Sequence, residues 1–437
     1  MSASQKKSSK YLQSPKGTRD IIGEDFYAYQ GLFEKFQEVA VYYGFQPIQT
    51  PILEAEDVFL RGVGEHTDIV EKEMYGLKTK GGDKLVMRPE ATAAVVRAYI
   101  EHGMHTLPQP VMLYNYGAFF RHENPQKGRL REFRQFGFEI IGTPKSIADA
   151  IVIRTIVDAL EEIGVHDMCV ELNSIGDPES RVAYIRALTN YYKKNVDAIC
   201  PTCKERLKTN PLRVLDCKDD RCQPIKLAAP ESLNHLSVPA KKHFKEVLEY
   251  LDSADIVYKI DHTLVRGLDY YSHTVFEIKA IQPSTEDGED APAPLTIAGG
   301  GRYDGLAKIL GSKKDIPAVG GAIGIDRILH TEGIKTPKPR IMKKPKVYFI
   351  QLGFEAKLKS LSVIEMLRKA NIPIMQSLSK DGLGAQLGAA ERLGVPYTII
   401  FGQKEAMDGT VIVRNMDNRS QETVSLEDLP KHLKGMK

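Results

Sequence analysis

The stretch Leu264-Val-Arg-Gly-Leu-Asp-Tyr-Tyr-Ser-His-Thr-Val-Phe-Glu277 places a cation, a glycine and two adjacent phenols within six positions. Arg266 can bind an anion such as phosphate through two parallel hydrogen bonds. Gly267 allows another group to approach the backbone closely. The hydroxyls of Tyr270 and Tyr271 can donate to, or accept from, a small polar ring. The same run also fits an ordinary buried strand with an ion-paired arginine, so the other motifs of the chain must decide between the two interpretations.

A second informative stretch, Tyr114 to Ile141, contains two strand-like runs on either side of the polar loop Asn124 to Arg129. This pattern predicts a long antiparallel hairpin with a positive tip. Gln135 and Glu139 share one face of the second strand. With Arg121 on the partner strand, they predict a floor that binds a zwitterion and a phosphate together. A solvated hairpin with charged flanks is the alternative, but it leaves polar groups on one face of an aromatic strand unexplained.

Two more stretches have the composition of ligand sites. Ala298-Gly-Gly-Gly-Arg-Tyr-Asp-Gly305 and Val319-Gly-Gly-Ala-Ile-Gly-Ile-Asp-Arg327 bring glycines and a terminal arginine together, which suits the phosphates of a nucleotide. Glycine-rich turns alone are a weak signal. In Met87-Arg-Pro-Glu-Ala-Thr-Ala93, Glu90 and Thr92 open a predicted helix. They fit an ammonium site and a plain N-terminal cap equally well.

Composition narrows the class of protein. The chain has 437 residues, enough for two or three domains, and is 42% hydrophobic and 27% charged, as in a soluble globular protein. A net charge of +3 is too small for wholesale coating of a nucleic acid. We find no apolar run of membrane-spanning length and no hydrophobic signal core. Five cysteines do not indicate a disulfide framework, so we expect a cytoplasmic protein.

Hydrophobic periodicity predicts the order of elements in the first three quarters of the chain. We expect helices at 25–44, 91–102 and 146–163, and strands at 84–87, 111–116, 133–141, 168–172 and 263–278. A helical, charged segment at about 178–254 interrupts the pattern and indicates an inserted subdomain.

The last quarter of the chain has a different pattern. Residues 335–346 are rich in Lys and Pro and are interpreted as a linker. Beyond them, strands (347–352, 372–378, 397–401) alternate with helices (355–370, 383–393). This alternation predicts a small α/β domain with parallel strand pairs.

Taken in order, the four motifs resemble the histidyl-tRNA synthetase family of class II aminoacyl-tRNA synthetases. The resemblance runs from Lys16-Gly-Thr-Arg-Asp20 to the C-terminal domain, and the Arg-Gly-Leu-Asp-Tyr-Tyr element is characteristic of the histidine enzymes. It implies an α+β fold in which helices flank an antiparallel sheet, and a homodimer formed through the segment Phe45 to Leu53. The implied domains are a disordered extension (1–15), a catalytic domain (16–334), the linker (335–346) and an anticodon-binding α/β domain (347–437).

The resemblance also implies roles for residues. Glu139 and Tyr271 bracket the imidazole of L-histidine, and the remaining residues of the histidine site are Glu90, Ala91, Thr92, Gln135, Tyr270 and Tyr303. The catalytic residues are Arg121, Arg266 and Arg327, which grip the phosphates of ATP, with Mg²⁺ beside Arg327. Glu123 belongs to the same ATP site, and adenine stacks on Phe133. The hairpin tip, Gln126, Lys127 and Arg129, contacts the acceptor end of the histidine tRNA.

Two departures from the family pattern stand out. Gly321 occupies a position that is commonly aromatic, which implies a looser wall near the nucleotide. The loop Pro283 to Pro294 is long and acidic, but it contains none of the named residues.

Four of the five cysteines lie in the insertion. Cys200 and Cys203 have the spacing of zinc ligands, while Cys217 and Cys222 are spaced more loosely. A structural zinc site and a set of unrelated reduced thiols both fit this pattern, and the proposed chemistry needs no such metal. Cys169 is expected in a core strand.

Several other functions compete with an active histidine–tRNA ligase. A non-catalytic paralogue would act as a histidine-sensing regulatory subunit, but such paralogues generally lack the anticodon domain and degrade the Arg-Gly-Leu-Asp-Tyr-Tyr element. A zinc-stabilised RNA-binding protein predicts a strongly basic surface, yet residues 345–437 hold 13 Lys/Arg against 10 Asp/Glu. A prolyl or threonyl enzyme would share the C-terminal domain, but not the combination of Glu139, Tyr270 and Tyr271.

Overall fold

The computed structural model describes residues 12–125, 128–281, 295–331, 334, 336–340 and 345–436. The chain divides into two compact units, Met1–Pro339 and Arg340–Lys437, and each is described here by itself. Several predictions concern residues outside the described ranges: residues 1–11, Gln126, Lys127, the loop 283–294, and residues 335 and 341–344 of the linker.

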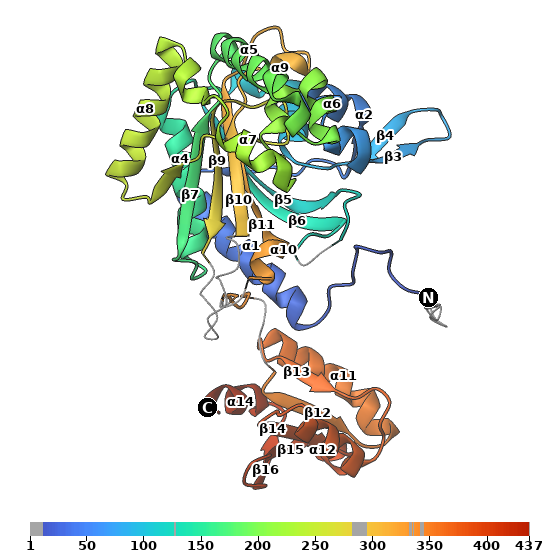
Figure 1. Cartoon of the computed structure of the whole chain (residues 1–437). Coiled ribbons are helices and arrows are strands. Elements are labelled where there is room, and N and C mark those ends of the chain that lie inside the picture. The colour runs from blue at the N-terminus through green and yellow to red at the C-terminus, as the bar shows by residue number, and fades with distance from the viewer. Residues whose placement is uncertain are drawn as a thin grey trace, which may run out of the picture. The chain divides into compact units, whose positions relative to one another are not determined.

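The first unit is built on a mainly antiparallel sheet (Figure 1). Within the described residues this sheet has eight strands, in the spatial order β1 (Gln46–Pro47), β5 (Val111–Phe120), β6 (Glu132–Ile141), β11 (Ala318–Gly324), β10 (Leu295–Arg302), β9 (Ser272–Ala280), β7 (Met168–Ser174) and β8 (Tyr258–Ile260). The predicted hairpin is β5 and β6, which pair from Val111 opposite Ile141 to Phe120 opposite Glu132.

Each face of the sheet has its own hydrophobic core. Alternate residues of β6, such as Phe136 and Phe138, pack under α1 (Glu24–Tyr42), α4 (Ile147–Glu161) and α8 (Val238–Ser253). The opposite face packs at one end against α2 (Glu56–Val63), α3 (Thr92–Glu101) and α9 (Leu306–Ile309). A three-stranded sheet of β2 (Leu53–Ala55), β4 (Lys84–Met87) and β3 (Tyr75–Lys78) adjoins this second core. The remaining face of β6, which carries Gln135 and Glu139, therefore lies opposite the α1–α4 layer.

The segment from Leu264 to Tyr271 is not a strand, contrary to our prediction of a strand over 263–278. Strand β9 begins at Ser272. The half-buried side chain of Arg181 donates one hydrogen bond of 3.1 Å to the carbonyl of Asp269 and another of 3.1 Å to that of Tyr271. Because a side chain occupies these two carbonyls, the backbone there leaves the ladder and forms a loop.

The helices of the insertion lie between β7 and β8 in the sequence. They are α5 (Pro178–Lys194), α6 (Pro201–Thr209), α7 (Gln223–Leu227) and α8, joined by short 3₁₀ turns. None of the described helices has the length and apolar character needed to cross a membrane.

The described residues of the second unit form a five-stranded sheet in the order β13 (Ile374–Gln376), β12 (Val347–Gln351), β14 (Tyr397–Phe401), β15 (Thr410–Asn415) and β16 (Gln421–Ser425). Strand β12 pairs in parallel with β13 and β14, as the alternating pattern predicts. The sequence pattern missed the antiparallel additions β15 and β16. The helices are α11 (Phe354–Lys369), α12 (Leu383–Arg392), α13 (Gln403–Asp408) and α14 (Leu429–Gly435).

Candidate active site

Glu139 occupies the centre of the polar face of the sheet. Its side chain projects from β6, and the residue is only 2% exposed. Tyr303, which follows β10, donates its hydroxyl to Oε2 of Glu139. Thr92, at the start of α3, donates its hydroxyl to Oε1 over 2.8 Å. Two elements far apart in the sequence thus fix the orientation of one buried carboxyl group.

The pKa of Glu139 is raised to about 8, chiefly by burial and also by the neighbouring charge of Glu90. The hydrogen bonds from Tyr303 and Thr92 lower the pKa, but they do not offset the loss of hydration. Glu139 is therefore able to hold a proton at neutral pH and to share it with a basic ring.

Glu90 caps helix α3. Its carboxylate accepts the backbone N–H groups of Thr92 and Ala93 at 2.6 and 2.8 Å, as an N-terminal cap does. The hydroxyl of Tyr270 also donates to Glu90, over 3.4 Å. Burial raises the pKa of Glu90. Ala91, between the cap and the helix, is buried as well.

The three tyrosines form one aromatic group beside these carboxyls. The ring centroids of Tyr270 and Tyr271 are 4.7 Å apart, and those of Tyr270 and Tyr303 are 5.7 Å apart at a steep angle. All three are at most 7% exposed. Tyr303 bonds Glu139 and Tyr270 bonds Glu90, so the tyrosines connect the two acidic groups.

Arg266 links the tyrosines to a second acidic group. Its guanidinium carbon lies 6.0 Å from the ring centroid of Tyr271. Nη1 of Arg266 donates to Glu277 on β9, and each of these side chains is 21% exposed. The buried Nε of Arg266 has no hydrogen-bond partner among the described residues. An unpaired N–H on a fixed cation is a suitable donor for an anionic ligand.

Arg327 reaches the same region from α10 (Ile325–Leu329). It donates to the carbonyl of Thr296 over 2.6 Å, and the hydroxyl of Thr296 donates to Glu277 over 3.0 Å. Burial lowers the pKa of Arg327, and the nearby charges of Arg129 and Arg121 lower it further. Several guanidiniums therefore lie close enough to repel one another, as expected of an anion site.

Arg121 follows β5 and faces Phe133 on the partner strand. Its Nε donates to the carbonyl of Pro89 over 2.9 Å, and its guanidinium carbon is 5.1 Å from the ring centroid of Phe133. One face of this ring, on which we expect adenine to stack, is thus in contact with Arg121. At the hairpin tip, Nε of Arg129 forms an ion pair of 2.8 Å with Glu123.

Sequence reasoning missed three polar residues of this region. Glu277 and Thr296 connect Arg266 to Arg327, and Asn115 on β5 lies across from Gly137. Asn115 is 6% exposed, and neither its amide oxygen nor its nitrogen has a hydrogen-bond partner among the described residues. Alternation along the strands was an available signal. Asn115 lies opposite Gly137, on the same face of the sheet as Gln135 and Glu139. Glu277 lies on the same face of its strand as Val275, which belongs to the second core.

Gly321 does not form a wall near the nucleotide, contrary to our expectation. A Cβ atom on Gly321 would lie 2.8 Å from Ile156 of α4 and 2.8 Å from Phe276, in the core beneath the sheet. Its neighbour Gly320 has the opposite orientation, and a Cβ there would lie 1.6 Å from Oε2 of Glu139. The sheet therefore requires glycine at 320 to accommodate Glu139, and at 321 to accommodate the core.

Comparisons with known proteins identify the family of the chain. The family model described as histidyl-tRNA synthetase matches residues 17–328, and one described as anticodon binding domain matches residues 346–436. The histidine–tRNA ligase of Dehalococcoides mccartyi (strain 195) is 43% identical over 420 residues, which cover 95% of this chain and 98% of the relative. That of Caldicellulosiruptor saccharolyticus is 40% identical over 427 residues, covering 97% and 99%.

A solved structure gives the same result. The crystal structure of apo histidyl-tRNA synthetase from S. aureus has a TM-score of 0.78 and 32% sequence identity, and the match covers 97% of this chain and all of that one. The predicted fold class is confirmed by this likeness. The chain belongs to the histidyl-tRNA synthetase family, whose members are histidine–tRNA ligases.

Proposed function

We propose that the polar face around Glu139 is where this ligase activates L-histidine with ATP to histidyl-adenylate, before transfer to the 3′ end of the histidine tRNA. AMP and diphosphate are the other products. The observation that carries the proposal is the continuous set of contacts from Glu139 through Tyr303, Tyr270 and Tyr271 to Arg266. These contacts run from a buried carboxyl group to a guanidinium with an unpaired N–H, which supports a site for an imidazole beside a phosphate.

The amino-acid end of the site is assigned by its hydrogen-bonding capacity. An imidazole presents a donor and an acceptor at opposite ring nitrogens. Glu139 would meet one nitrogen and Tyr271 the other. Glu90, Thr92 and Gln135 would surround the α-amino group, and the unpaired amide of Asn115 gives a further polar contact on the same face.

The nucleotide end is assigned by charge. During attack of the substrate carboxylate on the α-phosphate, negative charge builds up on the phosphoryl oxygens. Arg121 and Arg266 would stabilise that charge, and Arg327 would hold the γ-phosphate. Fixed cations need little reorganisation as the bond forms, so they lower the barrier without a protein nucleophile.

We propose that Mg²⁺ accompanies ATP. Magnesium in such sites is held by one or two carboxylates together with substrate phosphates. Glu277 and Glu123 fit this requirement, since both carboxylates act on the charge of Arg327. When bound, the ion would neutralise charge on the outer phosphates.

We also propose a homodimer. In the small sheet, Leu53, Met87 and Tyr75 stand opposite one another, and so do Ala55, Leu85 and Leu77, which places all six on one face. Leu53 and Leu77 are each 46% exposed, and the neighbouring Ile52 is 49% exposed. A contiguous exposed apolar face is typical of a protein interface. Leu53 also ends the segment Phe45 to Leu53, for which the family resemblance implies a role in the dimer.

The remaining proposals concern location and the competing function. A cytoplasmic location follows from the role of tRNA charging in translation. A histidine-sensing regulatory subunit finds no support, because the residues of the site are intact and residues 346–436 match an anticodon-binding domain.

The decisive experiment is exchange of labelled diphosphate into ATP, measured with each of the twenty amino acids. Exchange that depends on histidine alone is expected. Arg266→Ala should abolish this exchange without unfolding the protein, as checked by circular dichroism. Arg61→Ala is the matched control, since Arg61 is an exposed arginine paired with Asp57 on α2. Normal exchange by Arg266→Ala would contradict the assigned role.

A further inference from the structure

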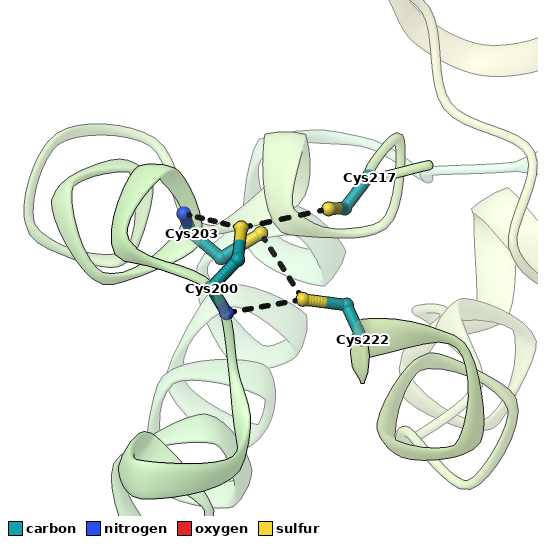
Figure 2. A group of neighbouring side chains, drawn as sticks. All are labelled: Cys200, Cys203, Cys217 and Cys222. Atoms are coloured by element: carbon teal, nitrogen blue, oxygen red, sulfur yellow. Dashed lines mark hydrogen bonds between the residues drawn. The ribbon is translucent and has the colours of Figure 1, made fainter. Parts of the chain in front are cut away.

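Four cysteines of the insertion meet at one point. Cys200 precedes α6, Cys203 lies in its first turn, Cys217 follows a 3₁₀ turn, and Cys222 ends another. Figure 2 shows their side chains directed toward a common centre. All four are buried, and their sulfur atoms lie within 4.8 Å of one another.

The separations match those around a single metal ion. The sulfurs of Cys200 and Cys217 are 3.8 Å apart, and those of Cys222 and Cys203 are 3.9 Å apart. Zinc–sulfur bonds of about 2.3 Å in a tetrahedron place the sulfurs about 3.8 Å from one another. A disulfide requires about 2.05 Å. An iron–sulfur cluster places several ions and sulfides between its cysteines, and this group of sulfurs is too compact to enclose one.

We propose that Cys200, Cys203, Cys217 and Cys222 bind one Zn²⁺ as a structural tetrathiolate site. On binding, each thiol transfers its proton to solvent and forms a Zn–S bond, so no electron transfer and no further reactant are needed. All four positions are filled by protein sulfurs, which leaves no coordination position for a substrate and makes the site structural.

The backbone around the sulfurs supports thiolates. The amide N–H of Cys200 donates to the sulfur of Cys222 over 3.2 Å, and that of Cys203 donates to the sulfur of Cys200 over 3.4 Å. The N–H of Asp219 donates to the sulfur of Cys217 over 3.4 Å. Outer hydrogen bonds of this kind orient metal ligands and stabilise their negative charge. Chance proximity of four reduced thiols does not predict such a set of donors.

The site supports the loop that carries Tyr270 and Tyr271. Helix α6 starts at the first two ligands, and Asn210, at its other end, donates to the carboxylate of Asp269 over 2.6 Å. Arg206 of α6 also pairs with Asp68 over 3.1 Å. Zinc therefore fixes the helix from which one side chain reaches the loop next to the tyrosines.

The first test is the metal content of the purified full-length protein, measured by elemental mass spectrometry after dialysis without chelator. About one zinc per chain is expected. Cys217→Ser should lose most of it. Cys169→Ser, the matched control outside the cluster, should keep it. Less than a tenth of an equivalent of zinc, or stoichiometric iron in its place, would overturn the assignment, as would full zinc retention by Cys217→Ser.

The second test needs no variant that could fail to fold. Protein produced with Co²⁺ in place of zinc should show the visible absorption of a tetrahedral cobalt thiolate, and adding zinc should remove it. Absence of these bands from cobalt-loaded protein would refute a tetrathiolate site.

Diphosphate exchange by Cys217→Ser tests the support of the loop that carries Tyr270 and Tyr271. A higher KM for histidine is expected, and an unchanged KM would refute the coupling through Asn210.

Discussion

At the scale of single residues, the environment of Glu139 determines how the site responds to pH. Its raised pKa of about 8 means that the free enzyme carries a proton there at neutral pH. Free histidine has an imidazole pKa of about 6.5. We assume that the complex holds one proton, shared by Glu139 and the imidazole. Between about pH 6.5 and pH 8, binding then neither takes up nor releases a proton. Below this pH range binding releases one proton, and above it binding takes one up.

We therefore expect the affinity for histidine to be bell-shaped in pH, with an alkaline limb near pH 8 that belongs to Glu139. Glu139→Gln should weaken binding and remove the alkaline limb, because the amide does not titrate. The KM for histidine in diphosphate exchange, measured from pH 6 to 9, checks this. An alkaline limb that persists in the variant would assign it to another group.

The same raised pKa affects stability. The folded protein holds the Glu139 proton more tightly than the unfolded chain, so this residue makes the fold less stable as pH rises from about 4.5 toward 8. Denaturant unfolding of the ligand-free protein should show this decrease, and Glu139→Gln should reduce its slope. Parallel slopes in both proteins would argue against the raised pKa.

Arg302 belongs to the glycine-rich stretch 298–305, whose composition suits nucleotide phosphates, yet its side chain is fully buried. It bonds Asp149 of α4, the carbonyls of Thr143 and Lys145, and Asp304. Burial would raise the pKa of Asp149, but Arg302 and His243 lower it to about 2. The pair therefore stabilises the fold above about pH 4, and this contribution is lost as pH falls through 2.

Arg302→Met should lower the free energy of unfolding by about 3–5 kcal/mol at pH 7, because it leaves the buried carboxylate of Asp149 with only His243 as its ion-pair partner. Urea denaturation measures this. Adding Asp149→Asn to Arg302→Met should recover part of the loss, since the uncompensated charge is then gone. A double variant as unstable as the sum of the two single variants would show that the residues act independently.

At the scale of elements, strand β11 separates two environments with adjacent glycines. Gly320 faces Glu139, and Gly321 faces Ile156 and Phe276. Neither position has room for a methyl group. An alanine at position 320 should affect the site, and an alanine at position 321 should affect the core.

Gly320→Ala should displace Glu139 and reduce kcat/KM for histidine on the order of a hundredfold, since a shift of about 1 Å at a substrate contact is that costly. Gly321→Ala should instead destabilise the fold by about 1–3 kcal/mol, with a nearly normal KM for histidine. Exchange kinetics and thermal unfolding of both variants separate these effects. Equal kinetic losses in the two variants would contradict the assigned faces.

Elements with strong local periodicity were predictable from sequence. Strand β4 and helix α3 were placed within a residue or so of their ends, because their apolar spacing is set by burial on one face. The prediction of a strand at 264–271 was wrong, because Arg181, more than 80 residues earlier in the chain, binds two backbone carbonyls of this segment. No local pattern reveals such a partner.

At the scale of the whole molecule, the strand order was beyond local reasoning. Strand β6 pairs with β11 across about 180 residues, and that pairing brings Gly320 next to Glu139. The family resemblance supplied the site residues that spacing alone could not. Alternation along the strands could have indicated Asn115 and Glu277, but only the assembled sheet shows that Glu277 and Thr296 connect Arg266 to Arg327.

The proposed dimer gives a prediction at this scale. Leu77→Glu places a charge on the exposed apolar face of the small sheet and should shift the protein from dimer to monomer in sedimentation velocity. Leu227→Glu is the control, because Leu227 is an exposed leucine on α7, outside that sheet. A wild-type protein that sediments as a monomer would refute the proposal, and so would a Leu77→Glu variant of unchanged mass.

The contact between Arg121 and Phe133 has a consequence for measuring nucleotide affinity. If adenine takes that face of the ring, the guanidinium must vacate it, and the departing cation is then free to approach the phosphates. Shortening Arg121 would remove its attraction to the phosphates, and it would also remove the group that competes with adenine for the ring of Phe133. The dissociation constant of ATP alone would therefore understate this side chain, and its full contribution would emerge only in the rate of adenylate formation.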